Sequence, residues 1–127
     1  MRFSRRMLLL TALALSACGG GPDKKAMEEA AALTRGDPHA GREQIRRYGC
    51  NACHTIPGIQ GAHGAAGPPL GGIVGRMYIA GVLTNTPDHM VKWIQDPPGI
   101  EPKTAMPNLG VTEEEARDIA AYLYALK

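Results

Sequence analysis

The feature that most constrains this chain is a pair of cysteines followed at once by a histidine, Cys50-Asn51-Ala52-Cys53-His54. The two thiols stand three positions apart, so a single helical turn can present both to the same flat group. His54 comes next, and an imidazole there can bind a metal ion from the same side. The motif predicts a fold built around a bound group that both thiols and the imidazole hold.

Three kinds of site use a Cys-x-x-Cys pair. A structural zinc site needs four ligands, and the one further cysteine, Cys18, has another predicted use. A thioredoxin-like redox pair needs the strand and helix of a βαβ fold, and the sequence contains no internal repeat and no confident strand. The added histidine is typical of c-type haem attachment, with His54 as the proximal iron ligand. We therefore predict one haem c, joined covalently to Cys50 and Cys53.

The first 17 residues have the pattern of an export signal. Basic residues up to Arg6 precede an apolar segment, 7–17, that is too short to cross a bilayer as a helix. Leu15-Ser16-Ala17-Cys18 then resembles the lipobox of bacterial lipoproteins, which implies cleavage before Cys18 and a diacylglycerol on its thiol. The alternative is an ordinary signal peptide beside an unrelated cysteine. We expect an exported protein, lipid-anchored to a bacterial membrane and facing the periplasm or cell exterior, where bacterial c-type haem is attached.

Charge excludes one class of partner. Removal of residues 1–17 takes away three of the 14 Lys and Arg residues and none of the 12 acidic residues, so the formal net charge changes from +2 to −1. A protein without a positive balance lacks the electrostatic basis of nucleic-acid binding. We expect no nucleic-acid partner.

The chain divides into three parts: a signal peptide (1–17), a lipidated cysteine with a flexible tether (18–36), and one folded domain (37–127). The tether contains an Ala-, Glu- and Lys-rich stretch, 24–34, expected to form a short helix that packs against nothing. A flexible tether of about 20 residues has an r.m.s. reach of about 25 Å. The domain would then move freely near the membrane.

Three segments of the domain have helix-start signals, and the second and third also carry an apolar stripe. They are expected at 38–48, at 87–95 and after Thr112, where Thr112 and Glu115 match a capping box. Between them, the segment 56–72 is too rich in Gly and Pro for a regular helix or a central strand, and wrapping a haem edge would explain its length. With few aromatic residues, the chain needs a buried haem to complete its core. We predict an all-α fold of three to five helices around one haem.

A low-spin electron-transfer haem needs a sixth ligand, usually Met or His. Met106 is favoured, because Thr104-Ala105-Met106-Pro107 is an irregular segment between two predicted helices and Pro107 stiffens it. Met77 and His63 lie in loops and stay possible. The remaining candidates fit other roles, since Met27 lies in the tether, His39 in the first helix, Met90 on an apolar stripe and His89 on the helix surface.

From about Gly41 to Leu126 the chain resembles a class I cytochrome c. The resemblance implies a small helical fold around one haem, in which the first and last helices cross at Gly41. It also implies that the Pro68 carbonyl accepts a hydrogen bond from His54. The matching pieces run in the family's order: Gly41, the Cys50–His54 motif, Gly67-Pro68-Pro69-Leu70, Trp93, Met106-Pro107 and Tyr122 in the last helix.

The same resemblance assigns roles to further side chains. Met106 matches the methionine that supplies the distal sulfur to iron. Trp93, Arg76 and Tyr78 match positions whose side chains hydrogen-bond a haem propionate. With Cys50, Cys53, His54 and Pro68, these residues make up the predicted haem site.

Residues 78–97 and 105–110 are similar to the cytochrome c domain fused to subunit II of some haem-copper oxidases. The likeness implies a non-enzymatic carrier of single electrons in a respiratory chain, from a quinol-oxidising complex toward a terminal oxidase. The alternative is a haem subunit that accepts electrons within a periplasmic dehydrogenase complex. A five-coordinate sensor or peroxidase ranks last, because the sequence offers no distal acid–base pair. We expect a monomer.

Overall fold

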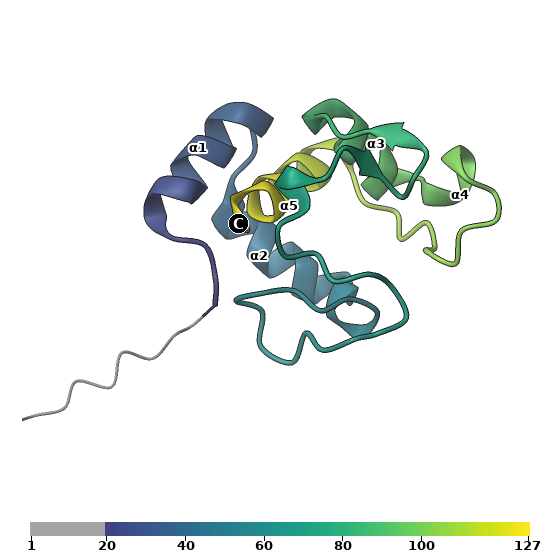
Figure 1. The fold of residues 1–127 in the computed structure, drawn as a ribbon, viewed down its shortest axis with the longest axis horizontal. Helices are drawn as coiled ribbons and strands as arrows, with labels where there is room; N and C mark the ends of the chain where they lie inside the picture. The colour runs from purple at the N-terminus through teal and green to yellow at the C-terminus, as the bar shows by residue number, and fades with distance from the viewer. Residues whose placement is uncertain (1–19) are drawn as a thin grey trace, which may run out of the picture.

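The structure, a computed structural model, describes residues 20–127; the predicted signal peptide and Cys18 lie outside the described residues. Within this range the chain is mostly helical, with one short antiparallel hairpin in which Ile79 pairs with Leu83. The predicted all-α class is confirmed. The elements are α1 (Lys24–Thr34), α2 (Pro38–Arg47), η1 (Cys50–Ala52), η2 (Ile73–Gly75), β1 (Tyr78–Ile79), β2 (Leu83–Thr84), α3 (Pro87–Gln95), α4 (Pro97–Ile100) and α5 (Glu113–Ala125) (Figure 1).

Side-chain caps set the starts of the longer helices. The Asp37 carboxylate accepts a hydrogen bond from the His39 N–H at 2.8 Å, and Pro38 occupies the first turn of α2. Thr86 caps α3 in the same way, and its hydroxyl accepts from the His89 N–H. Each cap satisfies an amide that the helix itself leaves unpaired. The predicted starts of α2, α3 and α5 are therefore observed.

Helix α5 is the centre of the core. It packs against α1, α2 and α3, and every residue from Ile119 to Leu126 is buried. Alanines at four positions of the helix let its neighbours approach closely, while Tyr122 and Leu123 fill the remaining space. The predicted apolar face of Ala116, Ile119, Ala120 and Leu123 is buried, as is the stripe of Met90, Val91 and Ile94 on α3. Among residues 20–127, no helix has the length and apolar character needed to span a membrane.

The α2–α5 contact depends on a glycine. A Cβ added at Gly41 would lie 1.9 Å from the Asp118 carbonyl oxygen and 2.9 Å from the Ile119 nitrogen, so the two backbones touch there. The Asp118 carboxylate adds two hydrogen bonds, from the Asp37 N–H at 2.8 Å and the Gln44 side-chain amide at 3.0 Å. The predicted crossing of the first domain helix and the last helix at Gly41 is confirmed.

Helix α1 forms where the sequence predicts it, but the expectation that it packs against nothing is wrong. Ala26, Ala30 and Thr34 are buried, and α1 lies along α5 (Figure 1). These residues recur every four positions, so together they form one narrow small-residue face. That face fits the alanine-rich surface of α5, and the interpretation of the whole stretch as a flexible tether missed it.

The start of α5 carries a compact polar cluster. Within the capping box, the Glu115 carboxylate accepts from the Thr112 N–H at 3.0 Å. It also accepts from the Tyr48 hydroxyl at 2.5 Å and pairs with the Arg47 guanidinium. The hydrogen bond from Tyr48 is the largest of the effects that lower the pKa of Glu115 from 4.5 to about 2. The cluster links the end of α2 to the start of α5.

We expect Glu115→Gln to lose stability mainly above pH 4.5. Because the folded pKa lies below the ordinary value of 4.5, the ionised carboxylate stabilises the fold above that pH, and this contribution falls as the pH drops toward about 2. Urea unfolding of wild type and variant between pH 6 and about pH 3 measures it. The difference in unfolding free energy should shrink as the pH falls. A difference that stays constant with pH would contradict the assignment.

Candidate functional site

The cysteine motif folds as a tight turn at the end of α2. Gly49 has a φ of 72°, a left-handed conformation that ends α2 and directs the chain into η1. The N–H groups of Cys53 and His54 both point to the Cys50 carbonyl, at 3.2 and 3.0 Å. The turn therefore groups two thiols and an imidazole. Both cysteines are free in the described chain; Cys50 is half-buried, which raises the pKa of its thiol, and Cys53 is exposed.

A single hydrogen bond fixes the orientation and tautomer of His54. Its Nδ1 lies 2.7 Å from the Pro68 carbonyl oxygen. A carbonyl can only accept, so Nδ1 carries a proton, and in the neutral imidazole Nε2 is then the nitrogen with the lone pair. An imidazole held in this way presents Nε2 to a metal ion, and the hydrogen bond raises its basicity.

Two glycines allow the loop to close on the motif. A Cβ at Gly67 would lie 2.3 Å from the Cε1 atom of the His54 ring, and one at Gly64 would lie 2.4 Å from the Ala52 carbonyl oxygen. The Gly67 N–H donates to the Cys53 carbonyl at 2.8 Å, and the Leu70 N–H donates to the Thr55 carbonyl at 2.9 Å. The Gly- and Pro-rich loop is thus bound to the turn at two points. Its composition reflects close contact with His54.

Met106 lies in an irregular segment between α4 and α5, as predicted. It is half-buried and packs against the core. Its N–H donates to the Thr104 hydroxyl at 3.2 Å, and farther along the Asn108 side chain donates to Asp96 at 3.1 Å. Side-chain hydrogen bonds of this kind shape a loop without a regular backbone ladder.

The other candidate ligands occupy different surroundings. Met90 is 2% exposed within the core, so its predicted packing role is confirmed. Met77 is 76% exposed, and His39 and His63 are also exposed. The His89 ring nitrogen lies 2.8 Å from the Thr84 carbonyl oxygen.

Trp93, Arg76 and Tyr78 lie on separate elements. Trp93 is buried on α3, whereas Tyr78 is exposed on β1. The Arg76 guanidinium donates to the carbonyl oxygens of Pro69 and Gly71, so it holds the segment directly after Pro68. The structure therefore groups Cys50, Cys53, His54 and Pro68, and connects Arg76 to them through the loop.

Sequence reasoning missed a residue that supports this loop. The Asn85 side-chain amide donates to the carbonyls of Ile73 and Arg76, both at 2.8 Å. Its oxygen accepts from the Tyr124 hydroxyl, whose burial raises the pKa of Tyr124 to about 12 and keeps it a donor. Asn85 thus ties η2 and Arg76 to α5. Its partners lie 9 to 39 residues away, so no local pattern marks it.

The family model for cytochrome c matches residues 38–127, and the chain belongs to the cytochrome c family. The match covers the domain from the start of α2 through α5. The segment that precedes the match includes α1, which packs on α5.

Individual relatives support the same family assignment. The chain is 35% identical over 105 residues to cytochrome c2 of Rhodopila globiformis, covering 72% of this chain and 95% of the relative. It is 33% identical over 88 residues to cytochrome c oxidase subunit 2 of Alkalihalophilus pseudofirmus, covering 68% of this chain. The same-named subunit of Bacillus sp. PS3 is 30% identical over 89 residues, covering 67%. The chain spans about a quarter of the length of either oxidase subunit, 25% in each case. No solved structure gives a significant match.

Family membership implies a covalently bound haem c and an electron-carrying function, and the observed site fits that group. Two free thiols lie on one turn, the Pro68 carbonyl holds His54 Nδ1 and so leaves Nε2 for a metal ion, and Gly67 leaves the ring the room it needs. A thioether-bearing methionine lies in a separate irregular loop. This donor set, two thiols, an imidazole and a thioether, suits haem c.

Proposed function

We propose that the protein is a membrane-tethered monohaem c-type cytochrome that carries single electrons in a bacterial respiratory chain toward a terminal oxidase. The observation that carries this proposal is the 2.7 Å contact between His54 Nδ1 and the Pro68 carbonyl oxygen, next to the two free thiols. It prepares Nε2 as a metal ligand. The similarity to two proteins named cytochrome c oxidase subunit 2 supports an oxidase as the electron acceptor.

Each predicted site residue then has a defined task. Cys50 and Cys53 would hold the haem through thioether bonds, and His54 Nε2 and the Met106 sulfur would be the protein ligands of its iron. Pro68 holds the His54 ring, while Trp93, Arg76 and Tyr78 serve as donors to the propionates. Bound haem supplies the one-electron ferrous/ferric couple. The thioether of Met106 favours the ferrous state and so a high potential.

The remaining parts of the proposal concern location. Cys18, outside the described residues, carries the lipid after export and removal of residues 1–17. The protein then stays on the outer side of a bacterial membrane as a monomer, with no nucleic-acid partner. It transfers electrons and changes no substrate chemically.

Visible spectra of the oxidised and reduced holo-protein, with and without carbon monoxide, test the haem assignment. We expect a low-spin haem, a redox titration that fits one electron, and no response to carbon monoxide because both axial positions are filled. Reoxidation of the reduced protein by a purified haem-copper oxidase under oxygen tests the acceptor. High-spin iron that binds carbon monoxide would contradict the His/Met carrier and favour a sensor or peroxidase.

Gly67→Ala probes the support of His54. The added methyl group collides with the imidazole ring, so we expect the Nδ1–Pro68 hydrogen bond to weaken and the ring to become a less basic ligand. Ferric iron loses more stabilisation than ferrous iron, and the midpoint potential rises by tens of millivolts, since a tenfold change in relative affinity corresponds to about 59 mV. Gly75→Ala, in open space, is the control and should leave the potential unchanged.

A further inference from the structure

Helix α1 is fastened to the domain along its whole length. Its buried face of Ala26, Ala30 and Thr34 lies on α5. Directly after the helix, the backbone at Gly36 meets the backbone of α5, because a Cβ there would lie 2.2 Å from the Arg117 carbonyl oxygen. Because the two backbones are in direct contact, α1 cannot shift along α5 without breaking this contact.

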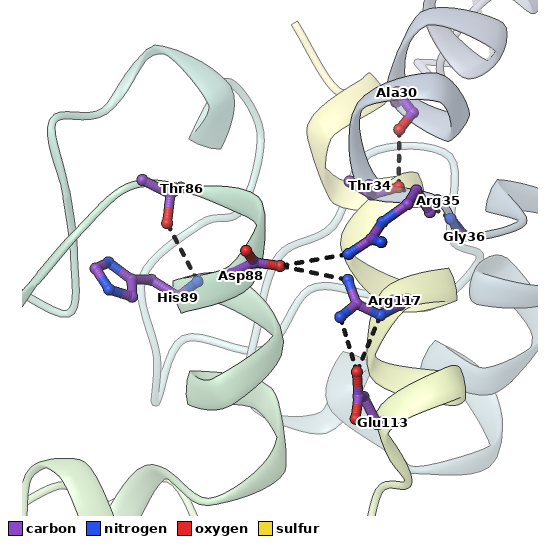
Figure 2. Close-up of polar contacts among 9 residues, drawn as sticks. All are labelled: Ala30, Thr34, Arg35, Gly36, Thr86, Asp88, His89, Glu113 and Arg117. Atoms are coloured by element: carbon purple, nitrogen blue, oxygen red, sulfur yellow. Dashed lines mark hydrogen bonds and ion pairs between the residues drawn. The ribbon is translucent and has the colours of Figure 1, made fainter.

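Surface ionic contacts link the C-terminal end of α1 to its neighbours (Figure 2). The Arg35 guanidinium lies 4.0 Å from the Asp88 carboxylate on α3, and Arg117 of α5 lies 3.4 Å from the same carboxylate. Arg117 also pairs with Glu113 at 2.7 Å. Asp88 therefore joins the end of α1 to both α3 and α5.

Close packing fixes the other end, where the chain enters the fold. A Cβ at Gly58 would lie 2.5 Å from the Gly21 Cα and 2.5 Å from the Tyr122 hydroxyl, so three segments meet at that point. Tyr122 donates to the Pro57 carbonyl at 2.9 Å, and Arg42 donates to the Gly58 carbonyl at 3.2 Å. The folded body therefore begins at Gly21, before the family match starts at residue 38.

This packing leaves very little free chain before the domain. Three residue steps separate Cys18 from Gly21, and a fully extended chain covers at most about 11 Å in that number. A flexible tether of about 20 residues would instead have an r.m.s. reach of about 25 Å. A lipid on Cys18 would thus hold one particular face of the protein against the bilayer.

We propose that α1 is a rigid mount that sets the orientation of the domain on a lipid bilayer, an inference that rests on the proposed lipidation of Cys18. The end at Gly21 and Gly58 lies toward the lipid headgroups. Figure 1 shows α1 and the start of the described chain at one end of the long axis, with α4 and the following loop at the other. The α4 end, with the loop that carries Met106, therefore points away from the membrane.

The lysines offer a direct readout of this orientation. Lys24 and Lys25 lie on the first turn of α1, and their side chains are 91% and 82% exposed. Lys127 lines the same surface hollow as Gly20 and Asp23. Lys103 lies in the exposed segment between α4 and α5. On phosphatidylcholine vesicles, a bulky membrane-impermeant amine reagent should label Lys24, Lys25 and Lys127 severalfold more slowly than in detergent, and Lys103 at the same rate.

Three altered proteins distinguish the effect of α1 packing on orientation from the effect of the lipid anchor. Ala30→Asp places a carboxylate in the α1–α5 interface and should release α1, whereas Ala32→Asp makes the same change at an exposed position of the helix. Lys24 and Lys25 should then label at the detergent rate in Ala30→Asp and stay protected in Ala32→Asp. Insertion of ten Gly and Ser residues between Gly20 and Gly21 leaves the packing intact and adds an r.m.s. reach of about 17 Å, so protection should be lost with the haem spectrum unchanged.

Mass spectrometry of the membrane-extracted protein makes the outcomes distinguishable. A mature chain without diacylglycerol on Cys18 overturns the anchor, and this inference with it. A lipidated wild type whose four lysines label on vesicles as they do in detergent overturns the mount alone. Protection that persists after the ten-residue insertion also overturns it, since orientation would then come from the surface and not from the short connection.

Discussion

Met106→Ala should convert the low-spin haem to a high-spin form that binds carbon monoxide. Alanine has no donor atom, so the iron would lose the thioether that we propose Met106 supplies, and the ferrous state would lose its stabilisation. Axial ligands set haem potentials over a span of about 0.8 V, and we expect a fall on the order of 0.1–0.3 V. Visible spectra with carbon monoxide, together with a redox titration, measure both effects.

Two other methionines serve as controls. Met77→Ala changes an exposed side chain and should leave the spectrum and the potential as in wild type. Met90→Ala removes a side chain that is 2% exposed, so it should cost about 2–5 kcal/mol of stability while the haem stays low-spin. If Met106→Ala remained low-spin and Met77→Ala did not, the axial ligand would be Met77.

Gly41→Ala should destabilise the fold, because no space for a methyl group exists where α2 meets α5. The new Cβ meets the backbone of Asp118 and Ile119, and these atoms can move only if α2 separates from α5. Helix propensity alone would favour alanine by about 1 kcal/mol. We expect a net loss of about 2–3 kcal/mol, as for overpacked cores.

Denaturant unfolding of the holo-protein, followed by far-UV circular dichroism, measures the loss. Gly75→Ala adds the same group where no atom lies within 4 Å and should change the midpoint little. A stabilised Gly41→Ala protein would mean that propensity outweighs packing and that α2 and α5 are not in backbone contact in solution.

Local signals predicted the elements that depend on local interactions. Caps at Asp37, Thr86 and Thr112 located α2, α3 and α5, and an apolar stripe supported the prediction of α3 and α5. The short hairpin was missed, because strands of two residues show no alternating pattern. Helix α4 was missed as well, since a four-residue helix with two prolines at its start looks like a loop. The packing of α1 against α5 was missed because a row of alanines on one helix face is equally compatible with a solvent-exposed helix and with a packed one.

In the candidate site, too, some residues could be predicted from the sequence and others could not. The cysteine motif could be recognised from its spacing. The family resemblance predicted the hydrogen bond between His54 and the Pro68 carbonyl. The support around the motif could not be foreseen from the sequence. Asn85 and Tyr124, or Asp118 and Gln44, meet across long stretches of chain, so only the folded structure reveals the pairs. Long-range polar contacts of this kind specify a unique packing without leaving a local pattern.

The pairing of α2 with α5 also dictates an order of events during synthesis. About 65 residues separate the end of α2 from the start of α5, and closing so long a loop is slow and gains nothing until the last helix exists. Because the chain is made from its N-terminus, α2 and the cysteine turn that follows it exist before α5 has been made. The cysteine turn follows α2 directly, so we expect it to reach its final position only after the last helix has packed on α2.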